Sequence, residues 1–344
     1  MRNLNFIISY LMGLTFSIFA ATHVNAETVG LRLFDIYMPH HGKAAESAFW
    51  YPAQSSGQSE TVFENPVFKG VMTEPDAPLA EGHHPVILLS HGLGGSIRSV
   101  AWLARGLTAR GATVISVSHL NSTWGSLDLS EGVKHWTRTQ DLTSALDFIL
   151  SHSDISQNLN LNNVMAAGFS FGGWTALSLG GAKANHGGLL SACDAEKQLL
   201  YCTPPLFDEI NSAEINVDIW NADHSDPRIH HVAAIDPGLV WGLTGADLSN
   251  LVGSVTLIGL GKGTNRLSGT DFDASGFASR IPQAQIIRFS QANHFTAMPL
   301  CTTFGQDILK DDNDDPVCTD PPGADRPAVH QHIVAVLAEQ IGLK

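Results

Sequence analysis

Short apolar runs alternate with segments of helical periodicity from Pro85 to the end of the chain, and this alternation constrains the fold most strongly. The run Pro85–Leu89 is uninterrupted and apolar, which is typical of a strand buried on both faces of a sheet. We expect further strands at 112–117, 164–167, 231–235, 255–258 and 285–289, and helices at about 100–107, 142–150, from 171 onward and at 327–343. The pattern predicts an α/β fold with a mostly parallel central sheet and helices on both faces.

Two segments do not follow this alternation. Residues 29–50 read as preceding antiparallel strands, with core candidates Phe34, Ile36, Phe49 and Tyr51. Residues 183–228 are polar and lack a strong period, so we expect an insertion after the helix that begins at 171, with a capping or functional role. No repeat or linker divides the chain, and residues 27–344 are expected to form one domain.

The N-terminus has the three parts of a secretory signal. Arg2 precedes an apolar run at 6–21, and Val24-Asn25-Ala26 supplies small residues for cleavage before Glu27. The alternative is a membrane anchor, but the apolar run is short for a bilayer span. Residues 1–26 are therefore predicted to be a signal peptide. The mature protein is expected to be secreted or periplasmic, without stable membrane insertion.

Charge and cysteine content limit the partners and the compartment. The 19 Lys and Arg against 33 Asp and Glu give a net charge of −14, which disfavours binding to nucleic acid. Four cysteines in an exported chain favour disulfides, and proximity favours two of the possible pairs, Cys193–Cys202 and Cys301–Cys318. Because the Cys-x-x-Cys spacing of zinc sites is missing, we predict no metal there.

The strongest functional motif is Gly168-Phe169-Ser170-Phe171-Gly172-Gly173, between an expected strand and an expected helix. A serine hydroxyl needs a sharp turn and a nearby base to act as a nucleophile, and the glycines permit such a turn. Ser170 is therefore the candidate nucleophile. In Ser90-His91-Gly92-Leu93-Gly94-Gly95, the loop after the first strand is suited to donate a backbone N–H to an oxyanion. We predict the amides of Leu93 and Phe171 as the oxyanion hole, with His91 shaping the loop.

A base and an acid must follow Ser170 in the chain. His294 comes directly after the last expected strand, at the carboxyl edge of the sheet, and is the candidate base among 16 histidines. Asp236 ends the strand after the Ser170 helix and is the candidate acid. Asp271 and Asp273 are the alternatives for that role, although both are also placed to cap a helix.

One acidic run raises the question of calcium. Asp311-Asp312-Asn313-Asp314-Asp315 offers carboxylate oxygens, but its order does not match an EF-hand loop. A solvated turn is favoured over a calcium site.

These motifs resemble an α/β-hydrolase of the predicted dienelactone hydrolase group, which is related to the platelet-activating-factor acetylhydrolases. The matching stretches are 49–52, 66–70, 84–95, 168–173, 234–238 and 293–295, so the resemblance spans nearly the whole mature chain except 183–228. It implies the α/β-hydrolase fold, and the acetylhydrolase branch places the acid at Asp236. Dienelactone hydrolases use a cysteine nucleophile, whereas this chain has Ser170.

The sequence therefore predicts a serine carboxylic-ester hydrolase that works through an acyl-enzyme and requires no cofactor. The expected partner is a small-molecule or lipid ester, of short-acyl or phospholipid type. Two other functions stay open: a peptidase or amidase with the same triad, and a non-catalytic binding protein that keeps the fold.

Overall fold

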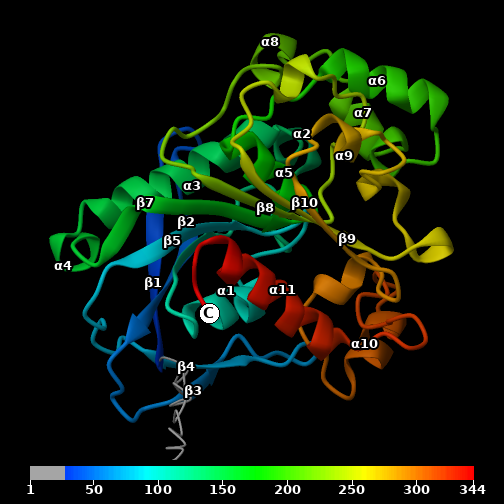
Figure 1. Ribbon diagram of the computed structural model, residues 1–344. Helices are drawn as coiled ribbons and strands as arrows, with labels where there is room; N and C mark the ends of the chain where they lie inside the picture. Colours follow the sequence, from blue (N-terminus) through cyan, green and yellow to red (C-terminus); the bar gives the residue numbers. More distant parts are fainter. Residues whose placement is uncertain (1–27) are drawn as a thin grey trace, which may run out of the picture.

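One ten-stranded sheet forms the centre of the molecule (Figure 1). The computed structural model describes residues 28–344, so the predicted signal peptide at 1–26 lies outside the described residues. The strand order is β10-β9-β8-β7-β5-β6-β2-β1-β4-β3. The strands are β1 (Thr28–Met38), β2 (Lys43–Ala53), β3 (Glu60–Val62), β4 (Val71–Pro75), β5 (His84–Ser90), β6 (Thr113–Val117), β7 (Leu159–Phe169), β8 (His231–Ile235), β9 (Ser254–Leu260) and β10 (Gln285–Phe289).

Six neighbouring strands of the sheet are parallel, and the strand direction reverses at β2 and again at β1. Strands β6, β5, β7, β8, β9 and β10 are parallel neighbours, whereas β2 runs antiparallel to both β6 and β1. The carboxyl ends of the six parallel strands therefore meet at one edge, where α/β folds place ligands. The predicted parallel strands and the preceding antiparallel pair are confirmed.

Helices cover both faces of the sheet, and the connections supply a few single turns. The α-helices are α1 (Ala101–Thr108), α2 (Leu129–Gly132), α3 (His135–Leu150), α4 (Ser153–Ser156), α5 (Phe171–Leu179), α6 (His186–Ala195), α7 (Leu206–Ile210), α8 (Val217–Trp220), α9 (Phe277–Arg280), α10 (Gly305–Asp311) and α11 (Arg326–Gln340). The 3-10 turns are η1 (Leu200–Cys202), η2 (Ala246–Leu248), η3 (Gly263–Asn265), η4 (Ser268–Thr270) and η5 (His294–Ala297).

The apolar run of β5 is buried from both sides, as its composition requires. Val86 and Leu88 face the core beneath α3 and α5, while Ile87 and Leu89 face the core beneath α1 and α11. Successive side chains of a strand point to opposite faces, so only a continuous apolar run fits between two helix layers. Figure 1 shows α1 and α11 on one side of the sheet and α3 and α5 on the other.

Three of the four core candidates in the first two strands are fully buried. Ile36, Phe49 and Tyr51 lie in the core. Phe34 is only half-buried, because it packs edge-on against Phe148 near the C-terminal end of α3. The prediction that Phe34 is a core residue was therefore only partly right, because Phe34 lies at the edge of the core.

The insertion at 183–228 is more regular than its sequence pattern suggests. It contains α6, η1, α7 and α8, which lie above α3 and α5 in Figure 1. These helices are short, and in α6 only His186, Leu189 and Cys193 are buried, which is too few for a periodic signal. The sequence feature that could have indicated these helices is the N-cap residue: the side chains of Asn185 and Asn216 each accept a backbone N–H at a helix start.

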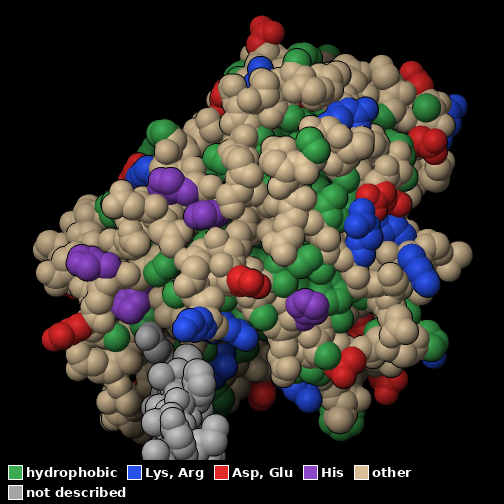
Figure 2. All heavy atoms as spheres, viewed as in Figure 1, with side chains coloured by type: hydrophobic (Ala, Val, Ile, Leu, Met, Phe, Trp, Pro, Cys, Tyr) green, Lys and Arg blue, Asp and Glu red, His purple; other side chains and the backbone are tan. Residues whose placement is uncertain are grey.

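The surface is mixed in charge. On the face shown in Figure 2, basic side chains are scattered among acidic ones and uncharged residues. Within residues 28–344, no helix combines the length and apolar character needed to cross a bilayer.

Candidate active site

Ser170 lies on a sharp turn between β7 and α5. Its φ of 58° falls in the left-handed region, which is unusual for a residue with a side chain. The turn is possible because its neighbours are glycines: a Cβ on Gly168 would collide with the carbonyl of Gly172, and a Cβ on Gly172 with that of Ser90. Backbone strain at one serine, held by close packing around it, is the arrangement expected of a nucleophile.

The structure brings Ser170, His294 and Asp236 together in one hydrogen-bonded chain. Ser170 Oγ lies 3.0 Å from His294 Nε2, and His294 Nδ1 lies 2.6 Å from Asp236 Oδ2. Asp236 is fully buried. The alternatives for the acid are engaged elsewhere: Asp271 accepts backbone N–H groups of the following turn, and Asp273 pairs with Arg288.

Asp236 is held by three further donors that the sequence did not reveal. The backbone N–H of Leu260 donates to Oδ1 at 3.0 Å, and Thr270 Oγ1 donates to Oδ2 at 2.8 Å. Arg266, which is almost fully buried, forms an ion pair with Oδ1. Both carboxylate oxygens of Asp236 thus act as acceptors in these contacts. The signal for Arg266 was its position in the loop after β9, at the edge of the sheet that carries Asp236.

A capping motif fixes the turn that carries His294. The side chain of Asn293 accepts the N–H of Thr296, and Thr296 Oγ1 accepts the N–H of Asn293. This reciprocal pair is a capping box, here on the single turn η5. The imidazole is thereby held on a rigid turn instead of a free loop.

Two backbone amides next to Ser170 have no partner in the described chain. Neither Leu93 N nor Phe171 N donates a hydrogen bond to another described residue. Phe171 begins α5, so its N–H is one of the free donors at a helix start. The loop of Leu93 lies against Ser170, since a Cβ on Gly92 would stand 3.2 Å from the Ser170 Cβ. Both amides are therefore available to an oxyanion formed at Ser170.

A second Ser–His–Asp chain lies behind this loop. Ser90 Oγ is 2.9 Å from His119 Nε2, and His119 Nδ1 is 2.8 Å from Asp141 Oδ2. Burial lowers the pKa of His119 to about 4, so this imidazole is neutral at physiological pH. Arg138 donates to Ser90 Oγ and to the carbonyl of His91.

The same contacts fix His91. The N–H of His119 donates to His91 Nε2, so His91 Nδ1 carries the proton that it donates to the Gly92 carbonyl at 2.6 Å. Burial holds the pKa of His91 well below its usual range. The expectation that His91 shapes the loop is therefore in accord with its contacts.

Accessibility separates the two chains. Ser90, His119 and Asp141 are fully buried, whereas Ser170 is partly exposed at the start of a helix. Ser170 is therefore accessible from solvent, and Ser90 is not. The buried chain thus serves to hold the loop 90–95, and no short motif could have revealed it because its members come from three distant segments.

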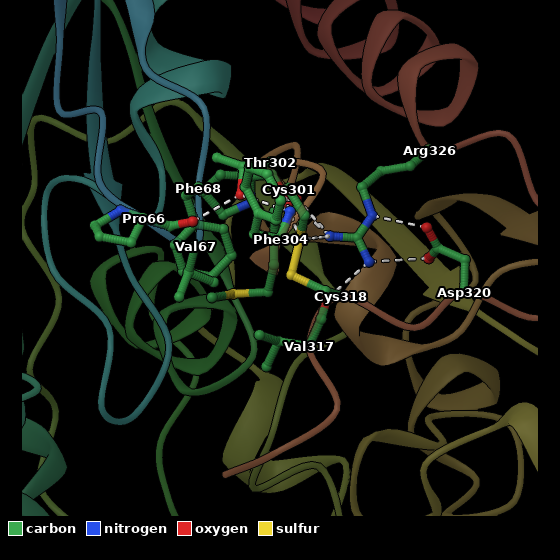
Figure 3. The surroundings of a disulfide bond; sticks show 12 residues. Pro66, Val67, Phe68, Cys301, Thr302, Phe304, Val317, Cys318, Asp320 and Arg326 are labelled. Atoms are coloured by element: carbon green, nitrogen blue, oxygen red, sulfur yellow. Dashed lines mark hydrogen bonds and ion pairs between the residues drawn. A yellow bond between two sulfur atoms is a disulfide. The ribbon is translucent and has the colours of Figure 1, made fainter. Parts of the chain in front are cut away.

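The two disulfides join Cys193 to Cys202 and Cys301 to Cys318, as expected from proximity. The second one lies beside an ion pair of the buried Arg326, which binds Asp320 and the carbonyls of Pro299 and Val317 (Figure 3). Asp320 also accepts from Thr296 Oγ1 at 2.7 Å. The loop closed by this disulfide therefore supports the turn that carries His294.

The acidic run 311–315 does not gather its side chains. These residues are exposed, and among residues 28–344 the only group with metal-ligand spacing lies elsewhere, at His40, His41 and Asp141. A calcium site at 311–315 has no support from this geometry.

Comparison with solved structures identifies the architecture. No family model matches the sequence, and no curated protein is significantly similar to it. Among solved structures, a ferulic acid esterase from Streptomyces cinnamoneus is 15% identical, with a TM-score of 0.54, over 93% of this chain and 90% of that one. The chain has the α/β-hydrolase fold.

Two further structures support the same conclusion. Esterase 2 of Thermogutta terrifontis is 12% identical with a TM-score of 0.51, over 91% of this chain and 95% of that one. A dienelactone hydrolase-like promiscuous phosphotriesterase from metagenomic libraries is 14% identical with a TM-score of 0.51, over 92% of this chain and all of that one. At these identities the likeness concerns the fold, and the chemistry must be argued from the site itself.

Proposed function

We propose that the protein is a serine hydrolase that cleaves carboxylic esters through an acyl-enzyme. The observation that carries this proposal is the hydrogen-bonded chain from Ser170 through His294 to the buried Asp236, beside two unpaired amides. Each part has the position that acyl transfer requires. The esterase activities named for the ferulic acid esterase and for esterase 2 agree with this chemistry.

The mechanism follows from the contacts. Ser170 Oγ attacks the ester carbonyl while its proton passes to His294 Nε2, and Asp236 stabilises the imidazolium that forms. The carbonyl oxygen becomes negative and accepts the N–H groups of Leu93 and Phe171, where the dipole of α5 also favours negative charge. His294 then protonates the leaving alcohol. Water, activated by the same imidazole, releases the acid and restores Ser170.

We further propose a lipid-type or otherwise apolar ester as substrate. Trp124 and Leu127 are 80% and 47% exposed, on a loop that pairs with Gly94 through Thr123 and so adjoins the candidate oxyanion hole. Large exposed apolar side chains next to a site are suited to contact an acyl chain or a lipid surface. This favours the short-acyl or phospholipid-type esters over strongly polar ones.

The insertion 183–228 is proposed to cap the pocket. Helix α7 packs against α2, which follows the Trp124 loop, and Ala184, Leu189 and Trp220 line a small apolar cavity with Leu239 and Trp241. The cavity is thus enclosed by the insertion together with the segment that follows Asp236. The insertion thus stands where it can select among acyl groups.

The two other readings differ in what they need. A peptidase or amidase uses the same triad, so only relative rates on matched esters and amides separate it from an esterase. A non-catalytic binding protein commonly lacks one of the reacting groups, whereas Ser170, His294 and Asp236 are all present here. Export to a secreted or periplasmic location rests on the signal-like segment 1–26 and agrees with the two disulfides.

The primary test compares wild type, Ser170→Ala and Ser90→Ala on p-nitrophenyl esters and anilides of varied acyl length. We expect ester turnover in wild type, and a loss of about 10⁴-fold or more in Ser170→Ala. Ser90→Ala removes a contact of the loop that carries Leu93 but none of the proposed reacting groups, so its activity should fall far less than that of Ser170→Ala. Equal turnover by wild type and Ser170→Ala contradicts the proposal, and faster cleavage of anilides than of esters favours the amidase.

The substrate class is tested with Trp124→Ala. We expect KM to rise about tenfold on short-chain phospholipid vesicles, because a buried tryptophan contact contributes about 1.5 kcal/mol or more, with little change on soluble p-nitrophenyl acetate. Phe304→Ala is the control, because Phe304 is 69% exposed and lies on the Cys301–Cys318 loop. Equal effects of the two variants on vesicles would contradict a role for the Trp124 loop.

A further inference from the structure

Two adjacent histidines lie beside a buried carboxylate that comes 101 residues later in the chain than the first of them. His40 and His41 form the turn between β1 and β2, and Asp141 lies in α3. His40 Nε2 is 2.8 Å and His41 Nε2 is 3.3 Å from the same oxygen, Asp141 Oδ1. The three donor atoms lie within 4.8 Å of one another.

Hydrogen bonding does not account for this cluster. His40 Nε2 bonds Asp141 Oδ1, but His41 Nε2 has no hydrogen-bond partner among the described residues, although its side chain is only 8% exposed. A buried polar atom left without a hydrogen-bond partner is unfavourable, so its presence here calls for an explanation. Both imidazoles point at one carboxylate oxygen.

A divalent cation would satisfy all three groups. Zinc binds imidazole nitrogen and carboxylate oxygen at about 2.0–2.2 Å, so its ligand atoms stand about 3–3.5 Å apart in a tetrahedral site. The 3.3 Å between His41 Nε2 and Asp141 Oδ1 has this spacing. A small movement of His40 would complete three protein ligands, with the remaining position left to water.

The outer contacts of the carboxylate are those of a metal ligand. Asp141 Oδ2, the oxygen not facing the two histidines, accepts from His119 Nδ1 at 2.8 Å. Ligating carboxylates are usually held in this way by a second hydrogen bond. The side chain of His40 is 18% exposed, so an ion has access from solvent.

We propose that His40, His41 and Asp141 form a binding site for a divalent transition-metal ion, with Zn²⁺ as the preferred ion. The ion ties the β1–β2 turn to α3. Through Asp141, His119 and Ser90 it also anchors the loop that carries Leu93. The role is structural, and the site is separate from Ser170, His294 and Asp236.

The test measures metal binding directly on the mature chain in a Ser170→Ala background, so that its outcome does not depend on ester hydrolysis. Protein stripped with a chelator is titrated with Zn²⁺ by calorimetry, and with Co²⁺ by its visible d–d absorption. We expect one ion per chain and a Tm higher by several degrees with Zn²⁺ present. The double variant His40→Gln/His41→Gln should lose at least about 100-fold in affinity, since it removes two of three ligands.

His83→Gln is the matched control, because His83 is exposed and also belongs to a pair of adjacent histidines. It should bind the ion as the parent does. The metal-free double variant should keep the far-ultraviolet circular dichroism of the parent, which shows that it is folded. The proposal is overturned if the parent binds no ion at millimolar Zn²⁺, or if the double variant binds as tightly as the parent.

Discussion

Asp236 accepts four hydrogen bonds or ion pairs, and only one of them comes from His294. The other three fix the carboxylate before any substrate arrives. Arg266 matters most among them, since it is charged, nearly buried and stacked over Phe272. Its guanidinium contacts Asp236 and the carbonyls of Leu260 and Thr270, so we regard it as a positioning residue.

Replacing Arg266 by Met should lower kcat about tenfold with little change in KM, because the carboxylate loses a fixed partner while the substrate surface is untouched. Unfolding in urea should also become easier by about 3 kcal/mol, since a buried charge is left without its partner. Arg266→Lys should recover part of kcat. A rise in KM at constant kcat would instead place Arg266 in substrate binding.

At this scale the sequence predicted Ser170, Asp236 and His294, because each follows a recognisable apolar strand and so must lie at one edge of the sheet. It did not predict Arg266 or Thr270, which reach Asp236 from an irregular loop. It also missed Ser90, His119 and Asp141 as a chain, since their proximity depends on how distant segments pack.

At the scale of elements, the turn η5 depends on the loop closed by Cys301 and Cys318. Asp320 lies just past this disulfide and joins Thr296 of η5 to Arg326 of α11. His330 of α11 adds a second contact, from Nε2 to the Thr296 carbonyl at 2.9 Å. The candidate base is thus held by a helix and a stapled loop together.

The double variant Cys301→Ser/Cys318→Ser should lose about 3 kcal/mol of unfolding free energy, because its 17-residue loop becomes free in the unfolded chain. Activity should fall by more than in Cys193→Ser/Cys202→Ser, whose loop makes no hydrogen bond to η5 among the described residues. Urea unfolding and kcat measured on both variants check this. Equal activity losses in the two double variants would contradict a role of the Cys301–Cys318 disulfide in positioning His294.

The elements were predictable wherever packing imposes a pattern. The parallel strands β5, β6, β8 and β9 are buried on both faces and read as apolar runs, and α11 shows an apolar stripe. The insertion was not predictable as helices, because α7 and α8 have one turn each and bury a single residue apiece. Short helices of this kind are stabilised by contacts that a local pattern does not contain.

At the scale of the whole molecule, buried neutral histidines make stability depend on pH. Burial lowers the pKa of His330 to about 4 and that of His135 to about 3. His135 lies under the insertion, where its Nε2 bonds the carbonyl of Trp220. Unfolding exposes both rings and restores a pKa near 6.5, so between about pH 6 and pH 4 the unfolded chain binds more protons than the folded one.

Acidification through this window should therefore lower the unfolding free energy, by up to about 1.4 kcal/mol per pH unit for each of the two histidines. Above pH 7 their contribution should be constant. His135→Phe should reduce the slope, and His83→Gln, at an exposed position, should not. Urea midpoints taken from pH 7.5 to pH 4.5 test this, and an unchanged slope in His135→Phe would contradict it.

The whole-molecule arrangement also explains the choice between two Ser–His–Asp chains. The chain of Ser90, His119 and Asp141 is fully buried, whereas Ser170 is partly exposed at the carboxyl edge of the parallel strands. We therefore propose that Ser170 alone is an activated nucleophile.

Reaction of the mature protein with a fluorophosphonate, followed by intact-mass and peptide mass spectrometry, tests most directly whether Ser170 is the activated serine. We predict one adduct per chain, on Ser170, that is retained in Ser90→Ala and absent in Ser170→Ala; an unlabelled wild type, or an adduct on another serine, would contradict the account.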